Sequence, residues 1–134
     1  MEENTKILLI DDDPDFVEST KDLLESYGYD VSFAYDGKSG LAKAQELKPD
    51  LMFLDVMMTS NTEGFDVARQ IRDSEDLRNI PVIMMTGIRE KMDLNFGFSP
   101  DEDWLPVSTV LEKPVEPARL ISTVEKQLKR ASEL

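Results

Sequence analysis

The sequence predicts a single α/β domain built on a parallel sheet. Five apolar runs of strand length alternate with stretches of helical periodicity, and each run is bounded by polar or turn residues. The third run, LMFL at 51–54, has no polar alternation, as expected for a central strand that helices cover on both faces. With 134 residues, 40% of them hydrophobic, the chain can fill one core. We therefore expect residues 1–134 to form one domain.

Each element has a local reason to form. Strands are expected at 7–10, 31–34, 51–54, 81–85 and 107–111. Helices are expected at 14–27, 37–47 and 65–73, and a last helix is expected after Pro117. Asp13 can cap the first helix, Pro14 suits its first turn, and Gly28 ends it. Asp36 opens the second helix and Pro49 follows its end. Residues 88–106 contain glycine, prolines and aromatics without a period, so a full helix is not expected there.

Composition excludes several classes of function. The chain has 15 Lys+Arg, 28 Asp+Glu and a net charge of −13, and no basic stripe for nucleic acid is visible, so we expect no direct nucleic-acid binding. Neither cysteine nor histidine is present, which removes disulfides, thiol or imidazole catalysis and the common zinc sites. No apolar run is long enough to cross a bilayer, and the first residues lack the basic start of a signal peptide. We expect a cytoplasmic protein without membrane attachment.

Polar residues follow four of the five expected strands. Asp11 and Asp12 come after the first strand, Asp55 after the third, Thr86 after the fourth and Lys113 after the fifth. Ligands of open parallel sheets bind beyond the carboxyl ends of the strands, where these side chains would converge. Clustered carboxylates require a proton or a cation, and oxygen ligands favour Mg²⁺. A metal, a lysine and a hydroxyl together suit a phosphoryl group, for which an Asp can be the nucleophile.

Four segments carry a resemblance to a known family. They are ILLIDD at 7–12, LMFLDVMM at 51–58, VIMMTG at 82–87 and KP at 113–114. Each lies at an expected strand end and in the same order as in response-regulator receiver domains of two-component signalling, which the chain resembles over essentially its whole length. The resemblance implies a flavodoxin-like, doubly wound domain with strand order 2-1-3-4-5 and helices on both faces. It also implies a phosphorylation-dependent switch. The composition of residues 88–106 departs from the family here and predicts that the customary fourth helix is short or replaced by a loop.

The resemblance assigns a role to each candidate residue. Asp55 would accept a phosphoryl group, Lys113 would pair with the phosphoryl oxygens, and Thr86 would move to hydrogen-bond the phosphate. The peptide bond between Lys113 and Pro114 would be cis.

The resemblance also implies a Mg²⁺ site. Asp12, Asp55 and the backbone carbonyl of Met57 would bind the ion directly, and Asp11 would assist mainly through a water molecule. Asp13 would then cap the helix outside the metal site.

The sequence departs from the family at three places. The loop 59–64 is one residue longer than usual, and the interval from Thr86 to Lys113 is also longer. Val110 stands where the family normally has Tyr or Phe three residues before the lysine, so the usual aromatic readout is missing. The resemblance implies that the side chains of Met57 and Ile88 flank the path of the water that attacks the phosphorylated Asp55. Both are apolar and cannot orient this water, so we expect slow loss of phosphate. The aromatics of 96–104 would either cover the sheet or dock a partner.

The resemblance names a class of upstream partner only. It would be a sensor histidine kinase or a phosphotransfer protein, and the response would pass to an unidentified downstream protein, because the sequence contains no output domain. The chain would not turn over an external substrate. The alternatives are a pseudo-receiver interaction module that is not phosphorylated, a haloacid-dehalogenase-type phosphatase, and a flavodoxin. The phosphatase needs a second acid where Met57 stands, and Asp11, Asp12 and Asp13 would repel flavin phosphate.

Overall fold

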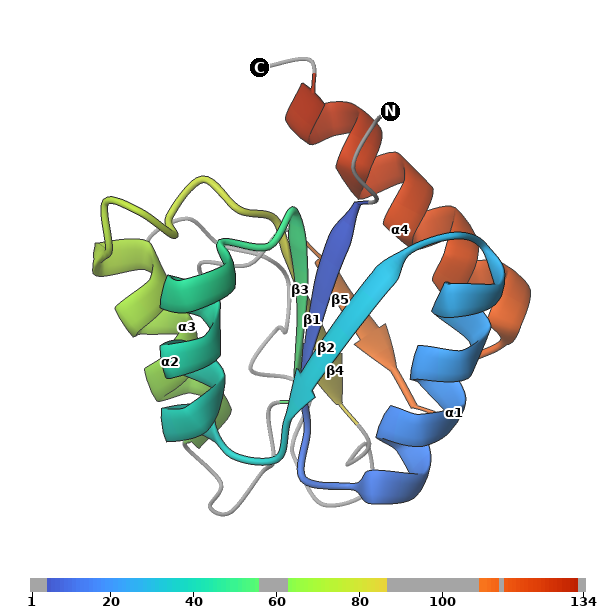
Figure 1. Ribbon diagram of the computed structural model, residues 1–134, viewed down its shortest axis with the longest axis horizontal. Helices are drawn as coiled ribbons and strands as arrows, with labels where there is room; N and C mark the ends of the chain where they lie inside the picture. Colours follow the sequence, from blue (N-terminus) through green and yellow to red (C-terminus); the bar gives the residue numbers. More distant parts are fainter. Residues whose placement is uncertain (1–4, 56–62, 87–108, 114, 133–134) are drawn as a thin grey trace, which may run out of the picture.

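A five-stranded parallel sheet with helices on both faces forms the domain (Figure 1). The computed structural model describes residues 5–55, 63–86, 109–113 and 115–132. Its elements are β1 (Lys6–Ile10), α1 (Pro14–Ser26), β2 (Asp30–Ala34), α2 (Gly37–Leu47), β3 (Leu51–Asp55), α3 (Glu63–Asp73), β4 (Val82–Thr86), β5 (Thr109–Glu112) and α4 (Pro117–Ser132). The strands are ordered β2-β1-β3-β4-β5, which confirms the predicted topology.

Two core clusters fill the spaces on either side of the sheet. The helices α2 and α3 cover one face, and α1 and α4 cover the other (Figure 1). Alternate residues of β1 supply the two clusters: Leu8 and Ile10 belong to the α2 and α3 side, Ile7 and Leu9 to the α1 and α4 side. All residues of β3 are buried, which explains why its sequence has no polar alternation.

Local capping fixes where the first two helices begin. The Asp13 side chain accepts hydrogen bonds from the backbone N–H groups of Asp15 and Phe16, at 3.1 and 3.3 Å. Asp36 accepts from the N–H of Ser39 at 2.8 Å, and this hydrogen bond lowers the pKa of the Asp36 carboxyl. Gly28 has a φ of 92° and ends the turn after α1, as its position in the sequence predicted.

The helix α2 packs unusually close to the sheet at Gly40. A Cβ atom added there would lie 2.7 Å from the Cδ1 atom of Ile10, inside the normal contact distance. Glycine is therefore required by packing at this position, although it is a weak helix former.

A lysine covers part of the outer edge of the sheet. β2 is an edge strand, and the Lys43 ammonium of α2 donates a hydrogen bond of 2.7 Å to the backbone carbonyl of Phe33. The same ammonium lies 5.3 Å from the centre of the Phe33 ring, which is itself 5.2 Å from the ring of Tyr35. The side chain of Lys43 thus crosses the exposed edge of β2.

The structure corrects some predicted boundaries by one or two residues. Asp55 and Thr86 are the last residues of β3 and β4, not the first residues after them, because they pair with Met85 and Glu112. Within the described residues, β5 begins at Thr109. The predictions for 56–62 and 87–108, which include the roles of Met57 and Ile88, and for the bond to Pro114 lie outside the described residues. None of the described helices is long and apolar enough to cross a membrane.

Candidate functional site

Three carboxylates meet at the carboxyl edge of the sheet. Asp11 follows β1 and is only 2% exposed, and Asp55 ends β3 and is 5% exposed. Asp12 extends into solvent beside them. One oxygen of each carboxylate lies within 4.8 Å of the others, so the structure brings together the acids that the sequence predicted.

Backbone hydrogen bonds hold Asp11 in place. Its N–H donates to the carbonyl of Ala34 at the end of β2, at 3.1 Å, which continues the pairing of β1 with β2. Its Oδ1 atom accepts from the N–H of Asp13 at 3.0 Å, where the chain turns into α1. Asp11 is therefore fixed in the strand and oriented by the turn that α1 begins.

Lys113 supplies the positive charge of the site. Its Nζ atom lies 2.7 Å from Oδ2 of Asp11 and 3.8 Å from Oδ2 of Asp55. Because Lys113 comes directly after β5, the ammonium reaches the acids across the carboxyl edge of the sheet. The described part of the site thus holds three carboxylates and one ammonium.

An aromatic ring lies against this lysine. The Phe16 ring, in the first turn of α1, has its centre 4.2 Å from Nζ of Lys113, within the range of a cation–π contact. The sequence placed Phe16 only in the apolar pattern of the first helix. Phe16 lies only four residues after Asp12, near the same edge of the sheet. This spacing was the one sign in the sequence that Phe16 could also contact the site.

The electrostatics of the site favour a cation. Burial raises the pKa of Asp12, and the neighbouring charge of Asp11 raises it further, while Lys113 opposes both effects. Asp12 is exposed overall, but nearby protein atoms remove part of the water around its carboxyl group. A cation bound among the three acids would relieve this repulsion. The all-oxygen donor set fits Mg²⁺, which takes one or two carboxylates together with water and phosphate oxygens.

The other predicted site residues are only partly described. Thr86 ends β4, on the strand next to the one that carries Asp55, so its backbone lies at the same edge of the sheet. Met57 lies outside the described residues. The site therefore rests on Asp11, Asp12, Asp55 and Lys113, with Thr86 placed by the fold.

Comparison with known proteins decides the family. The model of the response regulator receiver domain matches residues 7–125. The chain belongs to the response-regulator receiver family. This assignment removes the flavodoxin and the dehalogenase-type phosphatase as alternatives, and it establishes a signalling domain of phosphorylation-based pathways, not an enzyme that turns over a substrate. Receiver domains bind Mg²⁺ at an acidic pocket and are phosphorylated by histidine kinases.

Several relatives of this receiver domain are known. It is 36% identical over 129 residues to the DNA-binding dual master transcriptional regulator RpaA of Synechocystis. This match covers 96% of this chain and 51% of that protein. It is 34% identical over 128 residues to the alkaline phosphatase synthesis regulator PhoP of Bacillus subtilis, covering 96% and 50%. The chain thus spans about half the length of the curated relatives it matches.

Solved structures show the same fold. A CheY-like receiver domain of Methanospirillum hungatei has a TM-score of 0.83 at 25% identity, with 98% of each chain covered. The chemotaxis response regulator CheY4 of Vibrio cholerae has a TM-score of 0.79 at 26% identity, covering 92% of this receiver domain and 98% of that chain. Each of these two matches covers more than nine-tenths of this receiver domain.

Proposed function

We propose that this receiver domain is a switch in which Asp55 accepts a phosphoryl group from a sensor histidine kinase or a phosphotransfer protein. The observation that carries the proposal is the position of Asp55. It is buried at the end of β3, next to two further acids, and its Oδ2 atom lies 3.8 Å from the ammonium of Lys113. Such a position suits a nucleophile that works between a cation held by the acids and a fixed positive charge, which supports the proposal.

The transfer needs only one new bond. A carboxylate oxygen of Asp55 forms a bond to phosphorus, and the bond between phosphorus and the donor breaks, so that its electron pair leaves with the donor. The product is an acyl phosphate with additional negative charge at the sheet edge. In the unphosphorylated protein Lys113 lies closer to Asp11 than to Asp55. Its ammonium can therefore turn toward the phosphoryl oxygens without leaving the site.

The acids would hold Mg²⁺ in this function. We assign Asp12, Asp55 and the carbonyl of Met57 as direct ligands, with Asp11 assisting through water. When bound, the ion neutralises charge on the phosphoryl oxygens during transfer. The protein itself fixes Asp11 through hydrogen bonds with the backbone of Ala34 and Asp13. The acids are therefore already oriented before the ion binds.

The response would begin at Thr86. Its hydroxyl would hydrogen-bond the phosphorylated Asp55 and draw the chain that follows β4 with it. The changed surface would then be presented to a downstream protein. We also propose that residues 1–134 act as one receiver unit in the cytoplasm and bind neither DNA nor membrane directly. Phosphate would be lost slowly, because Met57 and Ile88 are apolar.

Intact-protein mass spectrometry after incubation with acetyl phosphate tests the proposal. We expect one phosphoryl adduct that requires Mg²⁺ and is absent from the variant Asp55→Asn. Asp50→Asn is the matched control. Asp50 precedes the same strand at its opposite end, where its side chain accepts a 2.8 Å hydrogen bond from the N–H of Lys6. An unmodified wild-type protein, which also fails to bind beryllofluoride, would instead support a pseudo-receiver that is not phosphorylated.

A further inference from the structure

The first turn of α1 and the acidic site are joined by a closed cycle of contacts. The Asp13 N–H donates to Oδ1 of Asp11 at 3.0 Å, and the Phe16 N–H donates to Oδ1 of Asp13 at 3.3 Å. The centre of the Phe16 ring lies 4.2 Å from Nζ of Lys113, and this ammonium donates to Oδ2 of Asp11 at 2.7 Å. Each of these four residues therefore contacts the next, and we call them the contact cycle.

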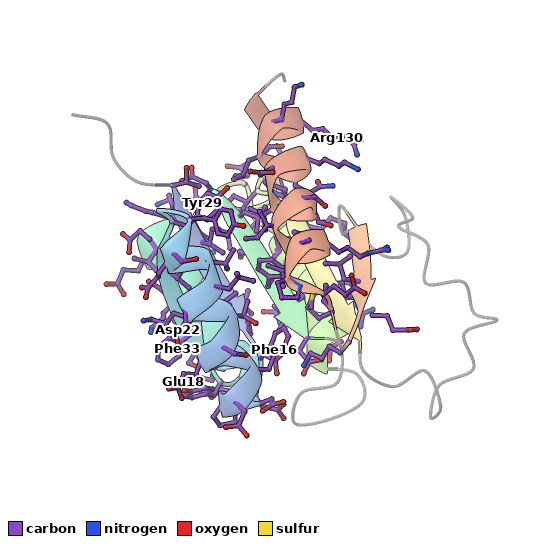
Figure 2. All side chains as sticks on the ribbon, turned by 90° about the vertical axis from the view of Figure 1, so that its right-hand side faces the viewer. Phe16, Glu18, Asp22, Tyr29, Phe33 and Arg130 are labelled. Atoms are coloured by element: carbon purple, nitrogen blue, oxygen red, sulfur yellow. The ribbon has the colours of Figure 1, made fainter. Side chains whose placement is uncertain are left out.

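The Phe16 ring is held from two directions. Its side chain is half-buried and packs on the core cluster at the α1 and α4 side of the sheet. Its backbone belongs to the turn that Asp13 caps, and the carbonyl of Asp13 also accepts from the N–H of Val17 at 3.0 Å. Figure 2 shows Phe16 near the beginning of α1, on the side of the helix that is turned toward the sheet. The position of the ring therefore depends on the helix cap as well as on the core.

The ammonium of Lys113 has two acids within reach. It lies 2.7 Å from Asp11 and 3.8 Å from Asp55, and 18% of the lysine side chain is exposed. A lysine side chain is long and flexible, so holding it in one place costs conformational entropy. A ring face attracts the ammonium, and it does so more strongly where water is partly excluded. The Phe16 ring therefore favours those conformations in which the ammonium stays beside the acids.

We propose that Phe16 and Asp13 are positioning residues for Lys113. Phe16 acts through its ring, and Asp13 acts by fixing the turn that carries the ring. When Asp55 bears a phosphoryl group, the ammonium can shift from Asp11 toward the phosphoryl oxygens and still lie against the ring. Asp13 thus contributes to phosphoryl transfer although it lies outside the metal cluster. This inference rests on the proposed function, because it concerns the lysine that would stabilise the transferred group.

Core packing alone would give Phe16 a simpler role. The first turn of α1 would then need only an apolar side chain, and leucine supplies one that also favours a helix. A leucine side chain has no negative π face for a cation. Phe16→Leu therefore removes the contact with Lys113 but keeps an apolar group against the core. Phe16→Tyr keeps the ring and should behave like the wild type.

NMR of the Lys113 side chain tests the geometry without phosphorylation. Protons close to the face of an aromatic ring resonate upfield, so we expect this shift for the ε-methylene protons of Lys113, assigned by their absence from Lys113→Arg. Phe16→Leu should abolish the shift, and Asp13→Ala should reduce it because the first turn loses its cap. Asp13→Asn should retain it, since asparagine caps a helix about as well as aspartate.

The initial rate of phosphorylation by acetyl phosphate with Mg²⁺ tests the consequence for the reaction. Phe16→Leu should be about three-fold slower than the wild type, and Asp13→Ala should be slower by up to about the same factor. Neither substitution should slow the reaction further when it is added to Lys113→Ala, because the group that they position is then absent. This non-additivity distinguishes positioning of Lys113 from a general effect on the site.

Two variants outside the contact cycle match these changes. Phe33→Leu removes a ring that lies 5.3 Å from the ammonium of Lys43, and Asp36→Ala removes the cap of α2. Both should leave the phosphorylation rate and the Lys113 signal as in the wild type, and Phe33→Leu should shift the signal of Lys43 instead. Circular dichroism should show all variants folded, so that lost stability does not explain a slower reaction.

Failure of this inference and failure of the proposed function give different results. A wild type that forms no adduct contradicts the proposed function, and the role of the two positioning residues falls with it. A wild type that is phosphorylated at a rate that Phe16→Leu and Asp13→Ala leave unchanged overturns this inference alone. A Lys113 signal that Phe16→Leu does not shift also overturns it, because the ring then does not lie against the ammonium. Equal slowing in the Lys113→Ala background would show that Phe16 acts through core packing instead.

Discussion

Neutralising Asp12 should stabilise the metal-free protein. Its carboxylate has two like-charged neighbours with oxygens within 4.8 Å, and at that distance each repulsion is about 0.9 kcal/mol in water or about 3.5 kcal/mol at an effective dielectric constant of 20. Because Asp12 is exposed, the lower figure applies. Attraction to Lys113 opposes this repulsion, so Asp12→Asn should gain on the order of 1 kcal/mol. This corresponds to a rise in Tm of about 4 °C.

Thermal unfolding in EDTA measures the repulsion at Asp12 without metal, and thermal unfolding in Mg²⁺ measures how far the bound ion offsets it. In EDTA the variant should unfold at a higher temperature than the wild type. In Mg²⁺ the difference in unfolding temperature between the variant and the wild type should shrink or change sign. The wild type binds the ion with one more carboxylate, and binding stabilises the folded state. Asp13→Asn is the control: it removes the same charge from the next residue, and asparagine caps α1 about as well as aspartate.

The pH dependence gives the same prediction a second readout. The pKa of Asp12 is raised in the folded state, so the folded protein binds this proton more tightly than the unfolded chain does. The ionisation of Asp12 therefore lowers the free energy of unfolding as pH rises from about 3.9 through the folded-state pKa. The variant Asp12→Asn should not show this decrease. If Asp12→Asn unfolds at a lower temperature than the wild type in EDTA, while Asp13→Asn does not, the repulsion argument is wrong.

Three further predictions concern packing, an alkaline titration and the lysine of the site. Gly40→Ala should lose about 1 kcal/mol in urea unfolding, because the clash with Ile10 outweighs the better helix propensity, and adding Ile10→Val should recover part of the loss. Burial and Glu125 raise the pKa of Tyr29, so wild-type stability should fall as pH rises above about 10, and Tyr29→Phe should lose less over that range. Phe16→Leu should slow phosphorylation by acetyl phosphate about three-fold through loss of the cation–π contact, whereas Phe16→Tyr should keep the wild-type rate.

The sequence predicted those features that depend on local neighbours or on sheet topology. The cap at Asp13 depends only on the next three residues, and the end of the turn at Gly28 depends only on the positive φ angle that glycine adopts there. The meeting of Asp11, Asp55 and Lys113 follows once the strands are parallel, because all three then lie at one edge.

Features that depend on side-chain placement were not predictable in this way. The contact between Phe16 and Lys113 joins two residues far apart in the sequence and depends on the rotation of α1 about its axis. The last residue of β3 was missed because the pairing of Asp55 with Met85 extends the strand by one residue. Only the fold shows that α1 and α4 share one face of the sheet.

The lysine that crosses β2 restricts how this protein can aggregate. An edge strand offers unpaired backbone groups to which another chain can add a strand, and this is a common beginning of aggregation. Here the ammonium of Lys43 occupies the carbonyl of Phe33, and an incoming strand would have to displace a hydrated charge to reach it. Growth of the sheet beyond β2 is therefore disfavoured.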